Sequence, residues 1–126
     1  MPQTPDGILT IRTLAMPADA NPAGDIFGGW VLAQMDIAGG VAAYEAACGR
    51  VVTAAIESMS FLKPVKVGDI LCVYCNVIST GRTSMKIHVE AWARRHRVGL
   101  REKVTEASFT FVALDDDGNP RPVKTI

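Results

Sequence analysis

One carboxylate in a long apolar stretch is the first residue of this sequence that could do chemistry. Asp36 lies between Trp30 and Ala43, where Gln34 is the only other polar side chain. A carboxylate among apolar residues is costly unless it is paired, hydrogen-bonded or functional. Asp36 is therefore either a structural group satisfied by backbone or hydroxyl donors, or a catalytic base or nucleophile.

Two glycines, Gly28 and Gly29, precede this apolar stretch. They are expected at the start of a helix, where N–H groups lack an intrahelical acceptor and the helix dipole favours negative charge. Glycine also permits a ligand to approach the backbone closely. The pair could therefore bind a developing oxyanion, or could simply shape the turn from a loop into a helix.

The element that must position these residues is a helix over residues 28–48. Its composition favours a helix, no proline interrupts it, and Gly49 suits its end. Because the segment is apolar nearly all round, we expect a buried helix that carries Asp36 well inside the protein. The mid-helix glycines Gly39 and Gly40 indicate very close packing, by sheet side chains or by a ligand, and sheet packing is favoured.

Five segments show the alternation of apolar and polar residues that is typical of strands, most clearly residues 83–94. Consecutive strands joined by short turns form antiparallel sheets. We therefore expect an α+β domain in which a long central helix is wrapped by a five-stranded antiparallel sheet. The predicted strands are residues 8–14, 50–62, 70–79, 83–94 and 103–114.

The composition limits the classes of protein to which this chain could belong. The 126 residues suffice for a single domain over 1–126, with its core at about 8–120. Thirteen basic and 13 acidic side chains balance to a net charge of zero, which favours neither nucleic-acid nor membrane-surface binding. The sequence shows no membrane-spanning run and no signal-peptide pattern, so a cytoplasmic location is expected.

The cysteines and histidines do not form a metal-binding pattern. Cys72 and Cys75 have a C-x-x-C spacing, but they lie in a predicted strand, where side chains three apart point to opposite faces. We therefore expect packing cysteines and no disulfide framework. His88 is expected on the polar face of a strand, and the basic cluster at 94–97 in a solvated hairpin. We expect no metal.

Several strings of the sequence carry a family resemblance. One runs Gly24-Asp-Ile-Phe-Gly-Gly-Trp30 and continues with Gln34-Met-Asp-Ile-Ala-Gly-Gly40. Together with strings at 49–53, 59–69, 81–84 and 103–113, they resemble the YciA-like acyl-CoA thioesterases of bacteria. The resemblance covers roughly residues 8–120. It implies a hot-dog fold, hydrolysis of acyl-CoA to a free acid and coenzyme A, and a catalytic role for Asp36.

Thioester hydrolysis requires an activated water or a covalent nucleophile, and donors for the oxyanion. The resemblance implies that Asp36 deprotonates water, or attacks the carbonyl to form a mixed anhydride; both alternatives stay open. The N–H of Gly28 or Gly29 is the expected oxyanion donor. Asn21 and Gln34 could orient Asp36 or a water, or could be ordinary hydrogen-bonding residues.

The spacing of Gly28 and Asp36 bears on how the site is built. Eight residues of ideal helix span about 12 Å, whereas a reacting carbonyl needs both groups within roughly 3–4 Å. We therefore predict a composite site at a dimer interface, with the glycine N–H from one subunit and Asp36 from the other. The resemblance also implies dimers, which could assemble further as trimers of dimers into hexamers.

Coenzyme A would be substrate and product, and no cofactor is expected. Its phosphates suit basic and hydroxyl groups, and the resemblance implies contacts in segments 58–64 and 81–84. The predicted contacts are Ser58, Met59, Phe61, Lys63, Pro64, Gly81, Arg82, Thr83 and Ser84.

Two other function classes stay open. A hot-dog hydratase or dehydratase would share the fold, but it usually needs a histidine near the central helix, and none lies between Asn21 and Gly49. A non-catalytic acyl-CoA-binding module would bind the ester without turnover and would not need Asp36. The lone carboxylate in an apolar helix argues against such a module.

Overall fold

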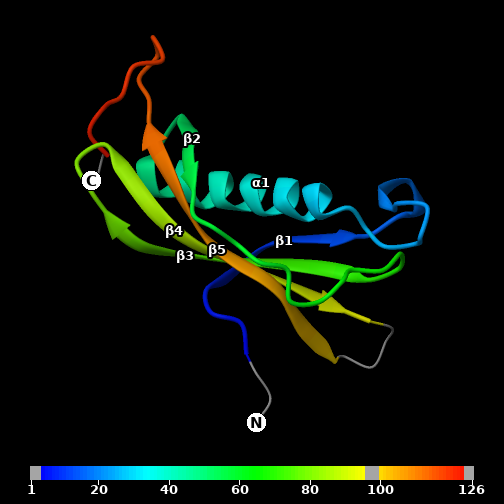
Figure 1. Ribbon diagram of the computed structural model, residues 1–126. Coiled ribbons are helices and arrows are strands. Elements are labelled where there is room, and N and C mark those ends of the chain that lie inside the picture. The colour runs from blue at the N-terminus through cyan, green and yellow to red at the C-terminus, as the bar shows by residue number, and fades with distance from the viewer. Residues whose placement is uncertain (1–3, 96–99, 124–126) are drawn as a thin grey trace.

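The computed structural model describes residues 4–95 and 100–123, which form one long helix lying across a curved sheet (Figure 1). Within these residues, no helix is long and apolar enough to cross a membrane. The elements in chain order are β1 (Ile8–Leu14), the short 3₁₀ helix η1 (Pro17–Asp19), α1 (Gly28–Ala47), β2 (Val51–Ile56), β3 (Ile70–Thr80), β4 (Ser84–Arg94) and β5 (Arg101–Ala113).

The sheet has five strands in the order β1-β3-β4-β5-β2, and all neighbouring pairs are antiparallel. A short turn over residues 81–83 joins β3 to β4, as the sequence predicts. The sheet curves around one side of α1 (Figure 1). The predicted α+β architecture, a long central helix wrapped by five antiparallel strands, is therefore confirmed.

The predicted strand over 50–62 is too long, and the short turn predicted after it is also wrong. The strand β2 ends at Ile56 and lies at an edge of the sheet beside β5, so residues 57–69 must cross to reach β3. Isolated hydrogen bonds still tie this connecting segment to β5, such as the one from the Leu62 N–H to the Val104 carbonyl (2.7 Å). The segment stays extended without forming a regular ladder, which explains why its sequence resembles a strand.

The core lies between α1 and the sheet. The apolar face of β4, predicted from its alternation, is buried from Met85 to Ala93. In the neighbouring strand β5, the rings of Phe109 and Phe111 stack on each other with centroids 6.3 Å apart. Gly39 meets this layer directly, because a Cβ placed there would lie 3.0 Å from the Phe111 ring. Close sheet packing, rather than a ligand, thus explains the mid-helix glycine.

The end of α1 differs from the prediction in one detail. Cys48, not Gly49, adopts the left-handed conformation that ends the helix (φ 56°). Arg121 Nη2 donates to the carbonyl of Ala47 (3.0 Å), and a Cβ at Gly49 would lie 2.9 Å from that same nitrogen. Gly49 therefore leaves room for an arginine that caps the helix and complements its dipole.

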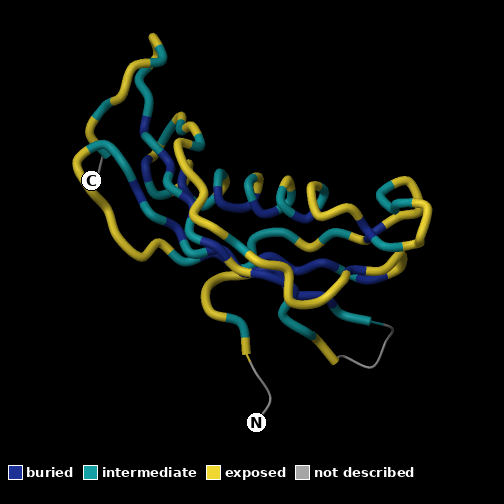
Figure 2. The backbone as a smooth tube through the Cα atoms, in the orientation of Figure 1, coloured by how far each residue is buried: buried dark blue, intermediate teal, exposed yellow. Residues whose placement is uncertain are grey.

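The predicted burial of α1 on all sides is wrong for a single chain. Ile37, Val41 and Tyr44 are 54%, 43% and 58% exposed, and Asp36 is only half-buried. Figure 2 shows buried residues on the side of the helix that faces the sheet and exposed ones on the side that faces away. Five strands can cover only one side of a helix, so an apolar surface remains uncovered.

Candidate active site

Asp36 meets a hydroxyl group from the edge strand. Thr53 Oγ1 in β2 donates to Asp36 Oδ1 over 2.6 Å, the length of a strong, charge-assisted hydrogen bond. The bond fixes the orientation of a half-buried carboxylate. Thr53 was not among the predicted site residues, although it lies in one of the strings that carry the family resemblance. Its role could be found only once β2 was placed beside α1.

The first turn of α1 presents two backbone donors. The helical ladder begins with the Trp30 N–H, which donates to the Phe27 carbonyl (3.1 Å). The N–H groups of Gly28 and Gly29 precede that bond, and neither has an acceptor among the residues that the structure describes. The Phe61 ring packs so closely on Gly28 that a Cβ there would lie 3.2 Å from it, whereas Gly29 has open space.

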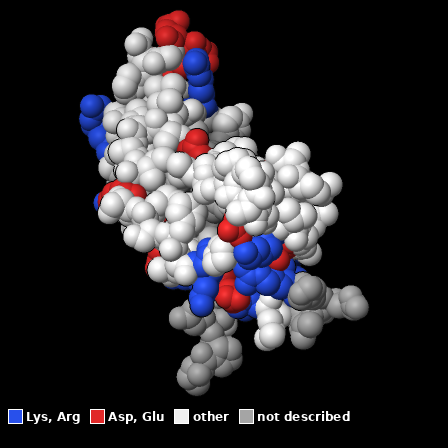
Figure 3. All heavy atoms as spheres, turned by 45° about the vertical axis from the view of Figure 1, so that its right-hand side comes forward, with Lys and Arg blue, Asp and Glu red and all other residues white. Residues whose placement is uncertain are grey.

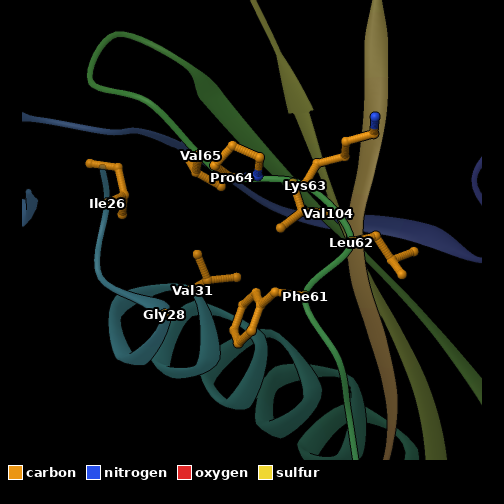
Figure 4. A pocket seen from close by; sticks show the side chains of 9 residues that line it. All are labelled: Ile26, Gly28, Val31, Phe61, Leu62, Lys63, Pro64, Val65 and Val104. Atoms are coloured by element: carbon orange, nitrogen blue, oxygen red, sulfur yellow. The ribbon is translucent and has the colours of Figure 1, made fainter. Parts of the chain in front are cut away.

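An open pocket of about 330 Å³ lies beside this first turn (Figure 4). Apolar side chains from α1, the connecting segment and β5 line it, among them Val31, Phe61 and Val104. Figure 4 shows the Phe61 ring beside Gly28 and the Lys63 amine directed away from the helix. The pocket therefore offers an apolar wall and the backbone of Gly28 at the helix N-terminus, with a cation at its rim.

Asp36 does not line this pocket. The helix α1 is continuous from Gly28 to Ala47, so the eight-residue spacing keeps its full length of about 12 Å between Gly28 and Asp36. Within one chain, the carboxylate and the helix N-terminus therefore lie apart.

Asn21 and Gln34 bond elsewhere in the single chain. The Asn21 Oδ1 accepts hydrogen bonds from the N–H groups of Ala23 (2.9 Å) and Asp25 (3.1 Å), and so shapes the loop before α1. The Gln34 Oε1 accepts one from Thr13 Oγ1 in β1 (3.0 Å). Positions 34 and 36 are about 200° apart around a helix. Gln34 therefore faces β1, while Asp36 faces β2.

The two segments predicted to contact coenzyme A lie at opposite ends of β5. Leu62 is bonded to Val104, whereas Ser84 pairs with Val112. Eight residues of strand separate these two levels, about 26 Å. Phe61, Lys63 and Pro64 line the pocket, and Ser58 and Met59 precede them in the same connecting segment. Gly81, Arg82 and Thr83 form the distant β3–β4 turn, and Ser84 begins β4.

Among the described residues, one cluster could offer ligand atoms to a metal. Asp6, His88 and Glu90 hold such atoms within 4.8 Å of one another, on the face of the sheet opposite α1. Lys103 Nζ lies 3.7 Å from Glu90, and His88 Nε2 lies 3.0 Å from it. Burial alone would raise the pKa of Glu90, but hydrogen bonds from Trp92, Asp6 and His88 and the Lys103 charge lower it overall. Hydrogen bonds from the protein and the Lys103 charge thus already satisfy this carboxylate.

The remaining predicted features concern cysteines and basic residues. Cys72 and Cys75 are free and buried, and burial raises the pKa of the Cys75 thiol. In the basic cluster at 94–97, positions 96 and 97 lie outside the described residues, and Arg95 pairs with Glu102 (2.6 Å). On the face shown in Figure 3, basic and acidic side chains lie together, and no broad basic surface forms there.

Comparisons with known proteins bear on this arrangement. Residues 23–100 match the thioesterase superfamily. The chain is 52% identical to the acyl-CoA thioester hydrolase YciA of Salmonella typhimurium over 98% of this chain and 95% of that protein. The hexameric thioesterase y2039 from Yersinia pestis superposes with a TM-score of 0.92 at 52% identity, over 98% of this chain and all (100%) of that one.

A hexameric, broad-specificity acyl-coenzyme A thioesterase of known structure also superposes with a TM-score of 0.92, at 49% identity over 98% of this chain and 85% of that one. A Campylobacter jejuni structure with a TM-score of 0.86 and 41% identity, covering 94% of this chain and 91% of that one, is described as a hexameric hotdog fold thioesterase. The fold, the apolar helix with its carboxylate, and these matches agree. The chain belongs to the thioesterase superfamily and has the hot-dog fold.

Proposed function

We propose that this chain hydrolyses acyl-CoA thioesters to a free acid and coenzyme A, with Asp36 as general base or nucleophile. The observation that carries the proposal is the short hydrogen bond from Thr53 to Asp36 on the flank of an otherwise apolar helix. A carboxylate held in one orientation can take a proton from water or attack a carbonyl carbon. The similarity to acyl-CoA thioester hydrolases supports the choice of substrate class.

The N–H groups of Gly28 and Gly29 would hold the oxyanion that develops on the thioester carbonyl. They suit this role because they lie at the positive end of the α1 dipole, and Gly28 lines the apolar pocket. The departing thiolate is a good leaving group, which makes a strong general acid less necessary. Asn21 and Gln34 would orient the reacting groups across the subunit boundary.

We propose further that two subunits complete each site. Two separations within the single chain support this: about 12 Å along α1 between the glycines and Asp36, and about 26 Å along β5 between the two coenzyme A segments. The strand β2 is an edge of the sheet on the flank that carries Asp36, so a second copy that pairs there brings its own helix to this carboxylate. Coenzyme A acts as substrate and product.

The first experiment measures coenzyme A release from acyl-CoA esters of increasing chain length, with wild type and Asp36→Asn side by side. We expect wild type to turn over and the folded variant to lose at least about a hundredfold in kcat. Circular dichroism of both proteins checks the fold. Turnover by neither protein would instead favour an acyl-CoA-binding module, and hydration of enoyl-CoA would favour a hydratase.

A second experiment tests the two-subunit site. Gly28→Pro removes one N–H at the first helical position, where proline is well accommodated after the extended Phe27 (φ −60°, ψ 136°). Gly28→Ala is the matched control, because it adds a Cβ beside Phe61 but keeps the N–H. We expect Gly28→Pro to lose roughly a hundredfold more kcat than Gly28→Ala.

Co-expression of Gly28→Pro with Asp36→Asn then separates the two architectures. If each site takes its glycine and its aspartate from different subunits, a mixed dimer has one intact site. Random pairing then restores about a quarter of wild-type activity. If one chain supplied both groups, no mixed dimer would be active, and the two-subunit site would be disproved while hydrolysis itself stood.

A further inference from the structure

Thr105 of β5 is a buried polar residue that the proposed mechanism does not use. It is fully buried (0% exposed), and its Oγ1 donates to the carbonyl of Ser60 over 2.8 Å. Among the described residues, the other buried polar side chains, Asp69 and Glu90, pair with charged groups. The Thr105 hydroxyl instead bonds the main chain of the connecting segment (57–69). Because a buried hydroxyl is costly unless it is bonded, this contact fixes both partners.

The pairing of β4 with β5 is irregular at this point. Trp92 pairs with Lys103 and Ala91 with Thr105, so Val104 has no partner in β4. An extra residue of this kind re-aims side chains, and such bulges are frequent beside active sites. Val104 lines the pocket beside α1, and Thr105 reaches the connecting segment. The irregularity thus places a pocket residue and the Thr105 hydroxyl at consecutive positions.

The connecting segment needs such bonds because it has little support of its own. Residues 60–64 are all exposed and belong to no strand. An exposed, irregular stretch opens easily unless it is fixed to the rest of the fold. Besides the bond from Thr105, the Leu62 N–H donates to the carbonyl of Val104 (2.7 Å). Two consecutive residues of β5 therefore hold this part of the segment.

Phe61 lies between the two peptide groups that are held. The Ser60 carbonyl precedes it and the Leu62 N–H follows it, and both are bonded to β5. The backbone is therefore fixed on each side of Phe61. Its ring lies beside Gly28, where a Cβ would be 3.2 Å from it (Figure 4). The place of this pocket wall at the start of α1 thus depends on Thr105.

We infer that Thr105 is a positioning residue that sets the substrate affinity of the proposed site by holding Phe61 beside Gly28. The inference rests on the proposed function, because it takes the pocket at Gly28 as part of the site. Thr105 is buried and does not line the pocket, so it acts on the substrate through the connecting segment. A pocket wall contributes equally to the bound substrate and the transition state, and its loss raises KM rather than lowering kcat.

The test is the steady-state kinetics of Thr105→Val on one acyl-CoA ester. Valine keeps the shape of the side chain but removes the donor to the connecting segment. We expect KM to rise about three- to tenfold, the equivalent of one neutral hydrogen bond, with kcat kept within about twofold. Thr105→Ser keeps the hydroxyl and should restore KM. Thr110→Val is the matched control in β5, at a residue that pairs with Lys86 and Ala55, and should leave both constants unchanged.

A double-mutant cycle shows whether Thr105 acts through Phe61. In the Phe61→Ala background the ring is absent, so Thr105→Val should change KM by less than about twofold. Equal effects of Thr105→Val in both backgrounds would overturn the inference. So would an unchanged KM in the folded single variant, even with a lower kcat, because a merely structural role reduces the active fraction of the protein.

The same comparison works without turnover. If wild type hydrolyses no ester, the proposed hydrolysis fails, and the Kd for coenzyme A, measured by isothermal titration calorimetry, replaces KM. An unchanged Kd in Thr105→Val would then overturn the inference by itself, and a wild type that neither hydrolyses nor binds would overturn both proposals. Thr105→Ala, which removes the hydroxyl and adds no atoms, repeats the test if Thr105→Val does not fold.

Discussion

Thr53 and Asp36 are 17 positions apart in sequence, yet their oxygens lie 2.6 Å apart in the structure. A hydroxyl donor at this distance limits the carboxylate to one rotamer and leaves Oδ2 for a water or a carbonyl carbon. We therefore assign Thr53 as a positioning residue, which acts on the reaction through Asp36.

Thr53→Val should lower kcat by roughly ten- to a hundredfold, the kinetic equivalent of one hydrogen bond to a charged group. KM should change little, because Thr53 does not line the pocket. Thr53→Ser keeps the hydroxyl and should restore most of kcat. Steady-state kinetics on one acyl-CoA ester measures all three proteins. An unchanged kcat in folded Thr53→Val would show that this hydrogen bond has only a structural role.

At the level of elements, Gly39 is a point of close contact between α1 and the sheet. The Phe111 ring and the Val89 side chain occupy the space that a Cβ would take, while the neighbouring Gly40 has ordinary contact distances, 3.7 Å from the same ring. Two adjacent glycines in one helix thus have different reasons to be there. Gly39 permits close packing on the sheet, whereas Gly40 lies beside the exposed side chains of Val41 and Tyr44.

Gly39→Ala should destabilise the protein by about 1–2 kcal/mol, because overpacking costs more than the helix propensity that alanine gains. Gly40→Ala, the matched control, should be neutral or up to about 1 kcal/mol more stable. Urea unfolding at one subunit concentration measures both variants, since assembly couples to stability. Equal stabilisation by the two substitutions would contradict the close helix–sheet contact.

For the whole molecule, the outer face of the sheet makes stability depend on pH. Glu90 is 4% exposed, and its pKa is lowered in the folded state because hydrogen bonds and the Lys103 charge outweigh burial. A group whose pKa is lowered on folding adds stability above its unfolded pKa, here near 4.5. That stability is lost as the pH falls through the folded pKa.

We expect wild type to lose stability steeply below about pH 4.5. Glu90→Gln should be about 1–3 kcal/mol less stable at pH 7, and its free energy of unfolding should fall less steeply below pH 4.5. The uncharged glutamine side chain cannot form an ion pair with Lys103, and its NH2 group places donors opposite His88. Urea unfolding from pH 7 to pH 3 measures both slopes. Parallel slopes would show that the acid sensitivity arises elsewhere.

The sequence alone determined the parts of the protein that depend on local periodicity. The start of α1 at Gly28, the buried face of β4 and the packing of Gly39 follow from propensity, alternation and the cost of a mid-helix glycine. These features repeat over a few residues, so the residues themselves report them.

Only the tertiary structure decided what depends on contacts between distant segments. Pairing of β2 with β5 instead of β3 ended the predicted strand at Ile56 and brought Thr53 to Asp36. The arrangement of the sheet on one side of α1 also left Ile37, Val41 and Tyr44 exposed. Strand order and helix coverage arise from long-range packing, and a local pattern of apolar residues is the same whether a sheet or a second subunit covers it.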